Sequence, residues 1–263
     1  MGIWDSKHVV SEYQQWTNSP AGGLALQAKI KLISDLMSGW PRRGRSILEI
    51  GCATGLLTEM FYHAGFDVTG IDSSSQMLVA ARERMQGRAD LHLGNAERLP
   101  FEDNQFDFVS VGSVLEHVDE PELVLSEALR VASRAVVVTV YSTWSIYYTC
   151  RDRNASTGAD RRNALSPLAV NKMLRDLAGD RDVIRRSILI GPVSTWKEAP
   201  FWKWLNSRIL PYGFGALSGI QIDVCDTKIT IPLMAKRCGT KPAILNACRT
   251  NIAARESSSS FDK

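Results

Sequence analysis

The stretch SILEIGCATGLL, residues 46–57, decides the fold. It begins with a short, mostly apolar run that contains one acid, Glu49, and reads as a buried strand. Gly51 and Gly55 follow, with Ala53 between them, and an apolar helical pattern starts directly after the second glycine. A strand that runs through a glycine-bearing loop into a helix is typical of a parallel α/β sheet that holds a nucleotide-like ligand at that loop.

The alternation of strands and helices continues to about residue 140. The patterns predict strands at 46–51, 67–72, 90–94, 106–111 and 135–140, and helices at 56–65, 73–85 and 121–132. We therefore interpret this part of the chain as a doubly wound α/β domain.

The regions on either side have other patterns. Residues 7–38 are predicted to form two helices, broken at a turn over 18–23. Beyond the domain, a helix is predicted at 166–179, where Ser166 is the cap. The chain is divided into an N-terminal helical segment at 1–45, the domain at 46–140, a remainder at 141–239 and a tail at 240–263 that we expect to be disordered.

The remainder is expected to complete the sheet. Two apolar runs, 183–190 and 228–237, are the candidates for the last two strands. Between them, at about 192–220, lies an insertion that holds three of the seven tryptophans. We expect it to be a hydrophobic cap over a substrate, a surface that rests on a membrane, or packed structure.

The composition is that of an ordinary globular protein. A net charge of +3 and a pI near 8.6 are too mild to indicate nucleic-acid binding, and no DNA partner is expected. The five cysteines contain no CxxC pair, so neither a disulfide framework nor a metal site is predicted. With no signal peptide or membrane span in the sequence, we expect a cytoplasmic protein.

The loop after the first strand limits the ligand. It lacks the G-x-G-x-x-G that a dinucleotide pyrophosphate requires. Glu49, two residues before the first glycine, would repel phosphates but suits a cationic amino group. Asp72 ends the second predicted strand, where an acid accepts from the hydroxyls of a ribose. The residues therefore indicate a ligand with a ribose and without a phosphate.

Four motifs now resemble a known family, the class I S-adenosylmethionine-dependent methyltransferases. They are LEIGCATG at 48–55, GIDSSSQML at 70–78, GNAERLPFEDNQFDFV at 94–109 and GSVLEHVDEP at 112–121. The chain is most similar to the small-molecule branch that includes the ubiquinone and menaquinone methyltransferases. The resemblance implies a Rossmann-like, seven-stranded α/β fold with an N-terminal helical lid and a helical insertion before the last strand. It also implies S-adenosylmethionine as the methyl donor.

The family's cofactor contacts carry over to matching positions in this chain. The resemblance assigns the methionine part to Glu49, Gly51, Cys52, Ala53 and Gly55, the ribose to Asp72, Ser73 and Met77, and the adenine to Asn95 and Ala96, with Gly112 also at the cofactor. Cys52 is expected to use only its backbone, and Met77 also suits a core position.

Two positions depart from the family pattern. Ala53 replaces the usual glycine, which is tolerated if its backbone stays in the ordinary region. Asn95 stands where many relatives have Asp, and its amide can still both donate to and accept from an adenine edge.

The reaction needs positioning and, for some acceptors, a base. His117, in the motif after the fourth strand, is the candidate base; the alternative is a histidine bonded to the backbone. Glu116 beside it is expected to be a solvated or capping acid. No metal is required for methyl transfer from a sulfonium.

The segments on either side of the domain at 46–140 hold the residues that indicate the nature of the methyl acceptor. Tyr13, Trp16, Tyr141 and Trp144 are the candidates to enclose an apolar or planar acceptor, with plain core packing as the alternative. Arginines at 151–162 would suit an anionic acceptor or a solvated loop.

Our prediction is a monomeric or homodimeric methyltransferase that acts on a small, apolar or aromatic metabolite. The motifs of nucleic-acid amino-methylating enzymes and of cytosine-C5 enzymes are missing from the sequence. Two alternatives stay open: a methyltransferase that acts on protein or RNA, and a regulatory protein that binds S-adenosylmethionine without catalysis.

Overall fold

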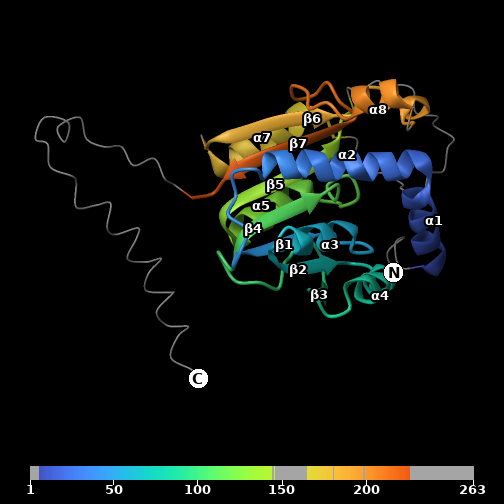
Figure 1. The fold of residues 1–263 in the computed structure, drawn as a ribbon. Helices are drawn as coiled ribbons and strands as arrows, with labels where there is room; N and C mark the ends of the chain where they lie inside the picture. The colour runs from blue at the N-terminus through green and yellow to red at the C-terminus, as the bar shows by residue number, and fades with distance from the viewer. Residues whose placement is uncertain (1–5, 144, 146–164, 180, 198, 226–263) are drawn as a thin grey trace, which may run out of the picture. The chain divides into compact units, whose positions relative to one another are not determined.

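The fold is a seven-stranded sheet with helices on both faces, seen in a computed structural model (Figure 1). The structure describes residues 6–143, 145, 165–179, 181–197 and 199–225. The strand order is β3-β2-β1-β4-β5-β7-β6. The strands are β1 (Ser46–Ile50), β2 (Asp67–Asp72), β3 (Asp90–Leu93), β4 (Phe106–Gly112), β5 (Ala132–Tyr141), β6 (Val183–Ile188) and β7 (Leu217–Asp223).

The chain reverses its direction of travel across the sheet at β1. This strand pairs in parallel with β2 on one side and with β4 on the other. β7 is antiparallel to both of its neighbours, β5 and β6. In open α/β sheets, ligands bind outside the carboxyl ends of the strands at such a reversal point. The carboxyl ends of β1 and β4 are therefore the place to look for a site.

Different helices cover the two faces of the sheet. The helices are α1 (Lys7–Asn18), α2 (Pro20–Leu36), α3 (Leu56–His63), α4 (Ser75–Met85), α5 (Pro121–Val131), α7 (Pro167–Ala178) and α8 (Pro200–Asn206), with a short 3-10 turn, η1 (Val193–Thr195). α2 and α3 pack on one face, where Phe61 and Phe108 are buried, and α5 and α7 pack on the other, where Leu125 and Leu174 are buried. α4 contacts β2, β3 and α3.

Local sequence explains where these helices begin. Ser74 and Ser166 each accept a hydrogen bond from the backbone N–H three residues later, so both are N-caps. Pro121 and Pro167 stand at first helical positions, where the missing N–H has no consequence. The helix starts that the sequence predicts are thereby confirmed.

A sharp joint separates α1 from α2, and the two helices are set at a wide angle in Figure 1. Ser19 ends the first helix and caps the second, because its hydroxyl donates to the Trp16 carbonyl at 2.7 Å and accepts from the Gly22 N–H at 3.1 Å. A Cβ at Gly22 would lie 1.9 Å from the Trp16 carbonyl oxygen. The joint therefore needs a glycine at this position. The predicted break over 18–23 narrows to Ser19, since α2 already includes the two glycines.

The last strand of the sheet is not the one that the sequence analysis favoured. β7 is LSGIQID at 217–223, so the insertion predicted at about 192–220 ends at residue 216. The run at 228–237 lies outside the described residues. Gly219 interrupts the apolar pattern of β7 because a Cβ there would lie 2.6 Å from Leu36 of α2. The close packing of α2 on the sheet requires a glycine within β7, so the apolar pattern that would predict this strand is broken.

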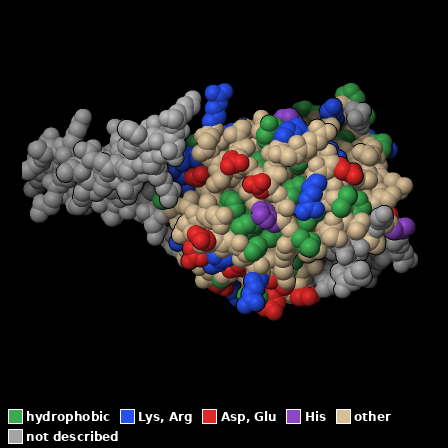
Figure 2. All heavy atoms as spheres, turned by 90° about the horizontal axis from the view of Figure 1, so that it is seen from below, with side chains coloured by type: hydrophobic (Ala, Val, Ile, Leu, Met, Phe, Trp, Pro, Cys, Tyr) green, Lys and Arg blue, Asp and Glu red, His purple; other side chains and the backbone are tan. Residues whose placement is uncertain are grey.

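Acidic, basic and hydrophobic side chains are mixed on the face seen in Figure 2. The edge strand β3 contributes to the exposed apolar surface through Leu93. Among the described residues, no helix is long and apolar enough to cross a membrane. The predicted tail, 240–263, and the arginines at 151–162 lie outside the part of the chain that the structure describes.

Candidate functional site

The loop between β1 and α3 is held against the end of β2. The N–H groups of Gly51 and Cys52 both donate to the carbonyl of Ile71, at 2.8 and 3.1 Å. The Ala53 N–H donates to a carboxylate oxygen of Asp72 at 2.8 Å. The strand ends and the glycine-bearing loop therefore form one unit.

Asp72 lies at the carboxyl end of β2, as expected. Its second oxygen accepts from the Ser74 N–H at 2.9 Å. Burial raises the pKa of Asp72, while the backbone N–H groups of Ser74, Ala53 and Ser73 act in the opposite direction. A carboxylate has about four lone-pair positions. Asp72 can therefore accept further hydrogen bonds, such as those of a ribose, without losing its loop contacts.

Glu49 is the second acid of the site and is almost fully buried, with 2% of its surface exposed. Its carboxylate accepts from the Thr58 hydroxyl of α3 at 2.5 Å. Burial raises the pKa of Glu49 to about 8, although Thr58 and the charge of Lys29 both lower it and Asp72 raises it. The interior here disfavours a negative charge, so a cationic ligand would stabilise the ionised form.

Lys29 is a residue of this region that the sequence analysis missed. It projects from α2, and its ammonium group donates to the carbonyl of Gly112, at the end of β4, at 3.0 Å. Its charge also acts on Glu49. One side chain thus joins the N-terminal helices to the ends of two central strands. The signal in the sequence is weak: a lysine within the apolar pattern of α2.

The backbone of the loop corrects one expectation. Ala53 in place of the usual glycine is expected to be tolerated if its backbone stays in the ordinary region, but its φ is 46°, in the left-handed region. Gly51 and Gly55 also have positive φ, 73° and 79°. A Cβ at Gly51 would in addition lie 2.2 Å from a methyl group of Val114. The loop therefore needs glycine-like geometry at three positions, and Ala53 adopts it with some strain.

Tyr13 is brought next to the two acids by α1. Burial raises the pKa of its phenol, and the negative charges of Tyr141, Glu49 and Asp72 raise it further. α1 also contacts α4, so this helix lies across the carboxyl edge of the sheet. The structure thus brings together one predicted acceptor residue and two predicted cofactor residues.

The other aromatic candidates are placed differently. Trp16 and Tyr141 are half-buried and pack against the core cluster beneath α2. The Tyr141 N–H donates to Glu116 at 2.7 Å. Trp144 lies outside the described residues.

The segment after β4 holds the candidate base. His117 is half-buried, and its backbone N–H donates to the backbone carbonyl of Val114 at 2.8 Å. Of the two roles expected for Glu116, solvated or capping, the structure supports the capping one, because only 2% of Glu116 is exposed. It caps the end of β5 through its bond to Tyr141, so its role is to position the segment. The assignment of His117 as a base stays a prediction.

The predicted adenine residues lie in the turn after β3. Asn95 is exposed, and its side chain both donates to and accepts from Glu97, at 3.2 and 3.0 Å. Glu97 in turn accepts from the N–H groups of Asp119 and Glu120, at 3.0 and 2.9 Å. Ala96 packs against the core. Glu97, which the sequence analysis did not select, therefore fixes this turn to the segment after β4.

Three further cofactor candidates have simple surroundings. Cys52 is buried against Gly70, and burial raises the pKa of its thiol, which suits a filler rather than a nucleophile. Met77 is buried in α4. Ser73 is exposed.

Two buried hydroxyls at this edge have no hydrogen-bond partner in the described part of the chain. Within the described part of the chain, Thr54 and Ser113 have buried hydroxyl oxygens that make no hydrogen bond. Thr54 lies in the glycine-bearing loop and Ser113 directly follows β4. Buried polar groups are usually satisfied, so two orphaned hydroxyls at the edge that also holds Asp72 and Glu49 fit a polar ligand such as S-adenosylmethionine. No group of side chains suited to a metal ion occurs among the described residues.

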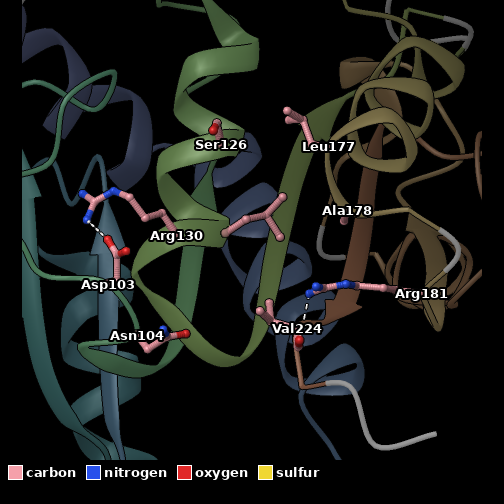
Figure 3. Close-up of a pocket in the computed structure, with 9 residues that line it drawn as sticks. Asp103, Asn104, Ser126, Arg130, Leu177, Ala178, Arg181 and Val224 are labelled. Atoms are coloured by element: carbon pink, nitrogen blue, oxygen red, sulfur yellow. Dashed lines mark hydrogen bonds and ion pairs between the residues drawn. The ribbon is translucent and has the colours of Figure 1, made fainter.

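The opposite edge of the sheet is built differently. A hollow of about 390 Å³ lies between α5 and α7, lined by Arg130, Arg181 and Leu177 among others (Figure 3). Both arginines are already engaged: Arg181 donates to the Val224 carbonyl at 2.8 Å, and Arg130 donates to Asp103 at 2.8 Å.

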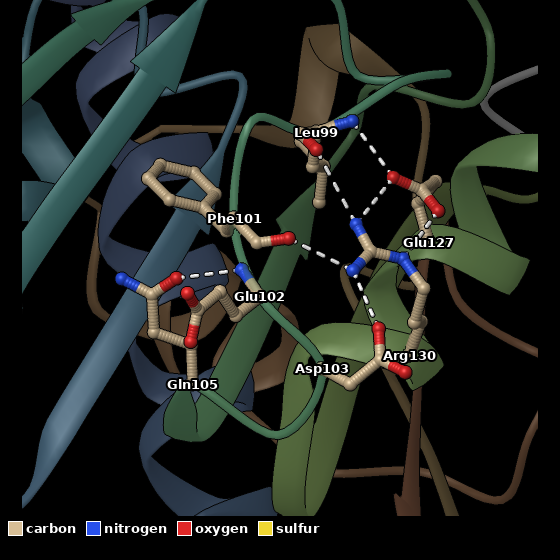
Figure 4. Close-up of polar contacts among 7 residues, drawn as sticks. All are labelled: Leu99, Phe101, Glu102, Asp103, Gln105, Glu127 and Arg130. Atoms are coloured by element: carbon tan, nitrogen blue, oxygen red, sulfur yellow. Dashed lines mark hydrogen bonds and ion pairs between the residues drawn. The ribbon is translucent and has the colours of Figure 1, made fainter.

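Arg130 is the centre of a structural network at that edge. It also donates to Glu127 and to the carbonyls of Leu99 and Phe101, so it holds the loop before β4 onto α5 (Figure 4). The partners of Glu127 lower its pKa, the Arg130 hydrogen bond being the largest cause. The hollow is therefore lined by groups that serve the fold.

Comparison with known proteins finds similar sequences over the first five strands. Residues 48–138 match the family model described as a methyltransferase domain. The demethylmenaquinone methyltransferase of Renibacterium salmoninarum is 37% identical over 101 residues, which are 38% of this chain and 41% of that protein. The phosphatidylethanolamine N-methyltransferase of Cereibacter sphaeroides is 37% identical over 103 residues, 37% of this chain and 50% of that protein. The chain thus spans half or less of these curated relatives.

Solved structures extend the likeness to the whole fold. A Thermotoga maritima methyltransferase, described as a possible histamine N-methyltransferase, has a TM-score of 0.68 and 22% identity, over 85% of this chain and 98% of that chain. The magnesium protoporphyrin IX methyltransferase of Synechocystis, with bound SAH, has a TM-score of 0.62 and 14% identity, over 84% and 96% of the two chains. Residues 48–138 are thus similar to a methyltransferase domain, and the chain has the seven-stranded, Rossmann-like fold of class I methyltransferases.

Proposed function

We propose that this protein transfers a methyl group from S-adenosylmethionine to a small, apolar or aromatic acceptor. The observation that carries the proposal is a pair of acids, the buried Glu49 and the half-buried Asp72, at the carboxyl ends of adjacent strands on either side of a glycine-bearing loop. Such a pair suits a ligand that joins a cationic group to a ribose. S-adenosylmethionine has both and lacks phosphates.

Each residue has a defined part in this proposal. Asp72 would hold the ribose and Glu49 would face the positively charged methionine part, with Thr54 and Ser113 offering free hydroxyls. When bound, the cofactor supplies an activated methyl group on a sulfonium. Lys29 fixes the end of β4, and the α1 helix places Tyr13 over the acids, where it excludes water.

The nature of the acceptor is supported by two features. Tyr13 and Tyr141 bring aromatic side chains to the same edge as the acids. The curated relatives are named for demethylmenaquinone and phosphatidylethanolamine, both lipid-like acceptors. An apolar acceptor is therefore the first class to test.

The experiment incubates the purified protein with methyl-labelled S-adenosylmethionine and cell extract, and then separates the label by fraction. We expect label in the organic-soluble fraction, and less label with Asp72→Ala when the cofactor concentration is limiting. Label in protein or RNA would contradict the acceptor class. Cofactor binding without label in any fraction would contradict catalysis and favour a regulatory protein.

A further inference from the structure

The insertion between β6 and β7 exposes large aromatic side chains. Phe201, Trp204 and Phe214 are 62%, 55% and 72% exposed. Single exposed apolar residues are normal on protein surfaces, but three large aromatics within one short insertion are not. The cofactor site described above does not use them.

Two of these aromatics form one surface with a cation. The ring centroids of Phe201 and Trp204 lie 6.4 Å apart on α8, and Trp202 lies 5.2 Å from Phe201. The guanidinium of Arg208 lies over the ring of Trp204, 4.8 Å from its centroid. We call Phe201, Trp204 and Arg208 the α8 face.

The rest of the insertion is packed and holds the α8 face in place. Trp196 is buried and its indole N–H donates to the Gly191 carbonyl at 3.0 Å. The buried Asn206 donates to the Thr195 carbonyl at 2.9 Å. Lys31 of α2 donates to the Ser207 carbonyl at 2.7 Å, which joins the insertion to the N-terminal helices. The aromatics are thus presented from a supported element.

The charges beside the aromatics are mainly positive. In sequence, the insertion at 189–216 contains Lys197, Lys203 and Arg208 and a single acid, Glu198, which lies outside the described residues. Tryptophan and phenylalanine that project among lysine and arginine are typical of a surface that enters the interface of an anionic membrane. Each cation near such a surface adds attraction to anionic lipid.

Topology places this surface at the functional edge. β7 is antiparallel to β5, so β7 begins where β5 ends, and β6 ends beside the start of β7. The insertion therefore starts and finishes at the carboxyl edge of the sheet, where Glu49 and Asp72 lie. We propose that the α8 face docks on an anionic phospholipid membrane and turns the carboxyl edge toward the lipid.

The test uses the full chain and two kinds of vesicle, phosphatidylcholine alone and phosphatidylcholine mixed with phosphatidylglycerol. We expect sedimentation with the mixed vesicles and a blue shift of tryptophan fluorescence. The double variant Phe201→Ser, Trp204→Ser should lower the partition coefficient by about tenfold or more, because two apolar side chains are lost from the interface. Lys203→Gln with Arg208→Gln should lower binding to the mixed vesicles several-fold.

Leu168→Ser is the matched control, because Leu168 is 56% exposed on α7, outside the insertion. It should bind the mixed vesicles like the unmodified chain, and circular dichroism should show that every variant is folded. Three results would overturn the proposal: no binding to the mixed vesicles, equal binding by the aromatic variant, or loss of a dimer rather than of lipid binding in that variant. No cofactor or acceptor is added, so the outcome is independent of the methyl-transfer test.

Discussion

The two edges of the sheet use carboxylates in opposite ways. At the carboxyl edge, Glu49 is buried, and the loss of water raises its pKa to about 8. At the amino edge, Glu127 is held by Arg130 and by the Leu99 N–H, and its pKa is lowered. The surroundings of Glu49 disfavour its negative charge, whereas the hydrogen bonds to Glu127 stabilise its negative charge. We infer that the amino edge is built for stability and the carboxyl edge for a ligand.

The first prediction concerns Glu49, the acid whose charge is disfavoured by burial, and uses the variant Glu49→Gln. A raised pKa means that the folded protein binds the proton more tightly than the unfolded chain. The contribution of Glu49 to stability is therefore fully present below its unfolded pKa and is lost as the pH rises through about 8. Because Gln carries no charge, we expect the variant to exceed the unmodified chain in free energy of unfolding by about 2–4 kcal/mol at high pH. Urea denaturation from pH 5 to 9 measures the difference, and parallel pH curves would contradict the burial account.

The second prediction separates the two edges by cofactor affinity. Asp72→Ala removes the acceptor proposed for the ribose as well as the loop contact from the Ala53 N–H. We expect S-adenosylmethionine to bind about 1–3 kcal/mol more weakly, as measured by calorimetry.

Asp107→Ala is the control at the amino edge, where Asp107 accepts from Arg134 and from the Ser46 N–H. This variant should lower stability and leave cofactor affinity unchanged. If the Asp72 variant and the unmodified chain bind S-adenosylmethionine with equal affinity, Asp72 is not part of the cofactor site.

The third prediction tests whether the N-terminal helices complete the carboxyl edge. Gly22→Ala puts a methyl group 1.9 Å from the Trp16 carbonyl oxygen, so α1 must move, and Tyr13 moves with it. Gly23→Ala is a neighbouring control, because its nearest atom, the Thr17 carbonyl oxygen, is 3.6 Å away. We expect a several-fold loss of cofactor affinity for the first variant and none for the second, which should gain about 0.5–1 kcal/mol of stability from helix propensity. If both variants bind alike, α1 has no part in the site.

The smallest effect is expected for Glu127→Gln at the amino edge. A lowered pKa gives stability that is present above the unfolded pKa and is lost as the pH falls through the folded pKa. The variant should therefore be less stable at neutral pH by about 0.5–1.5 kcal/mol, with the difference shrinking in acid. Thermal unfolding at pH 3 to 7 measures it. A pH dependence of the same sign as that of Glu49 would contradict the comparison.

Sequence reasoning reached what is encoded locally. The strands from β1 to β5 and the caps Ser74 and Ser166 follow from short patterns, and the structure confirms them. Asp72 and Glu49 were found because acids at the ends of apolar strands are conspicuous, although their binding roles stay predictions.

Features that depend on contacts between distant segments could not be read in this way. Lys29 reaches Gly112 only because α2 crosses the sheet. Gly219 interrupts the apolar pattern of β7 because Leu36 of the same helix packs closely against it. Ala53 combines a left-handed backbone with a hydrogen bond to Asp72, which lies on another strand. The sequence pattern holds no sign of these contacts because it records neighbours along the chain only.

The most direct test of the central claim is the proton exchange that accompanies cofactor binding. Calorimetric titration of S-adenosylmethionine at pH 7, in two buffers of different ionisation enthalpy, measures this quantity. A positively charged ligand favours the ionised form of Glu49, whose pKa is about 8 without it. We predict tight binding with net proton release from the unmodified chain and no release from Glu49→Gln. Binding without release from the unmodified chain, or no binding at all, would contradict the account.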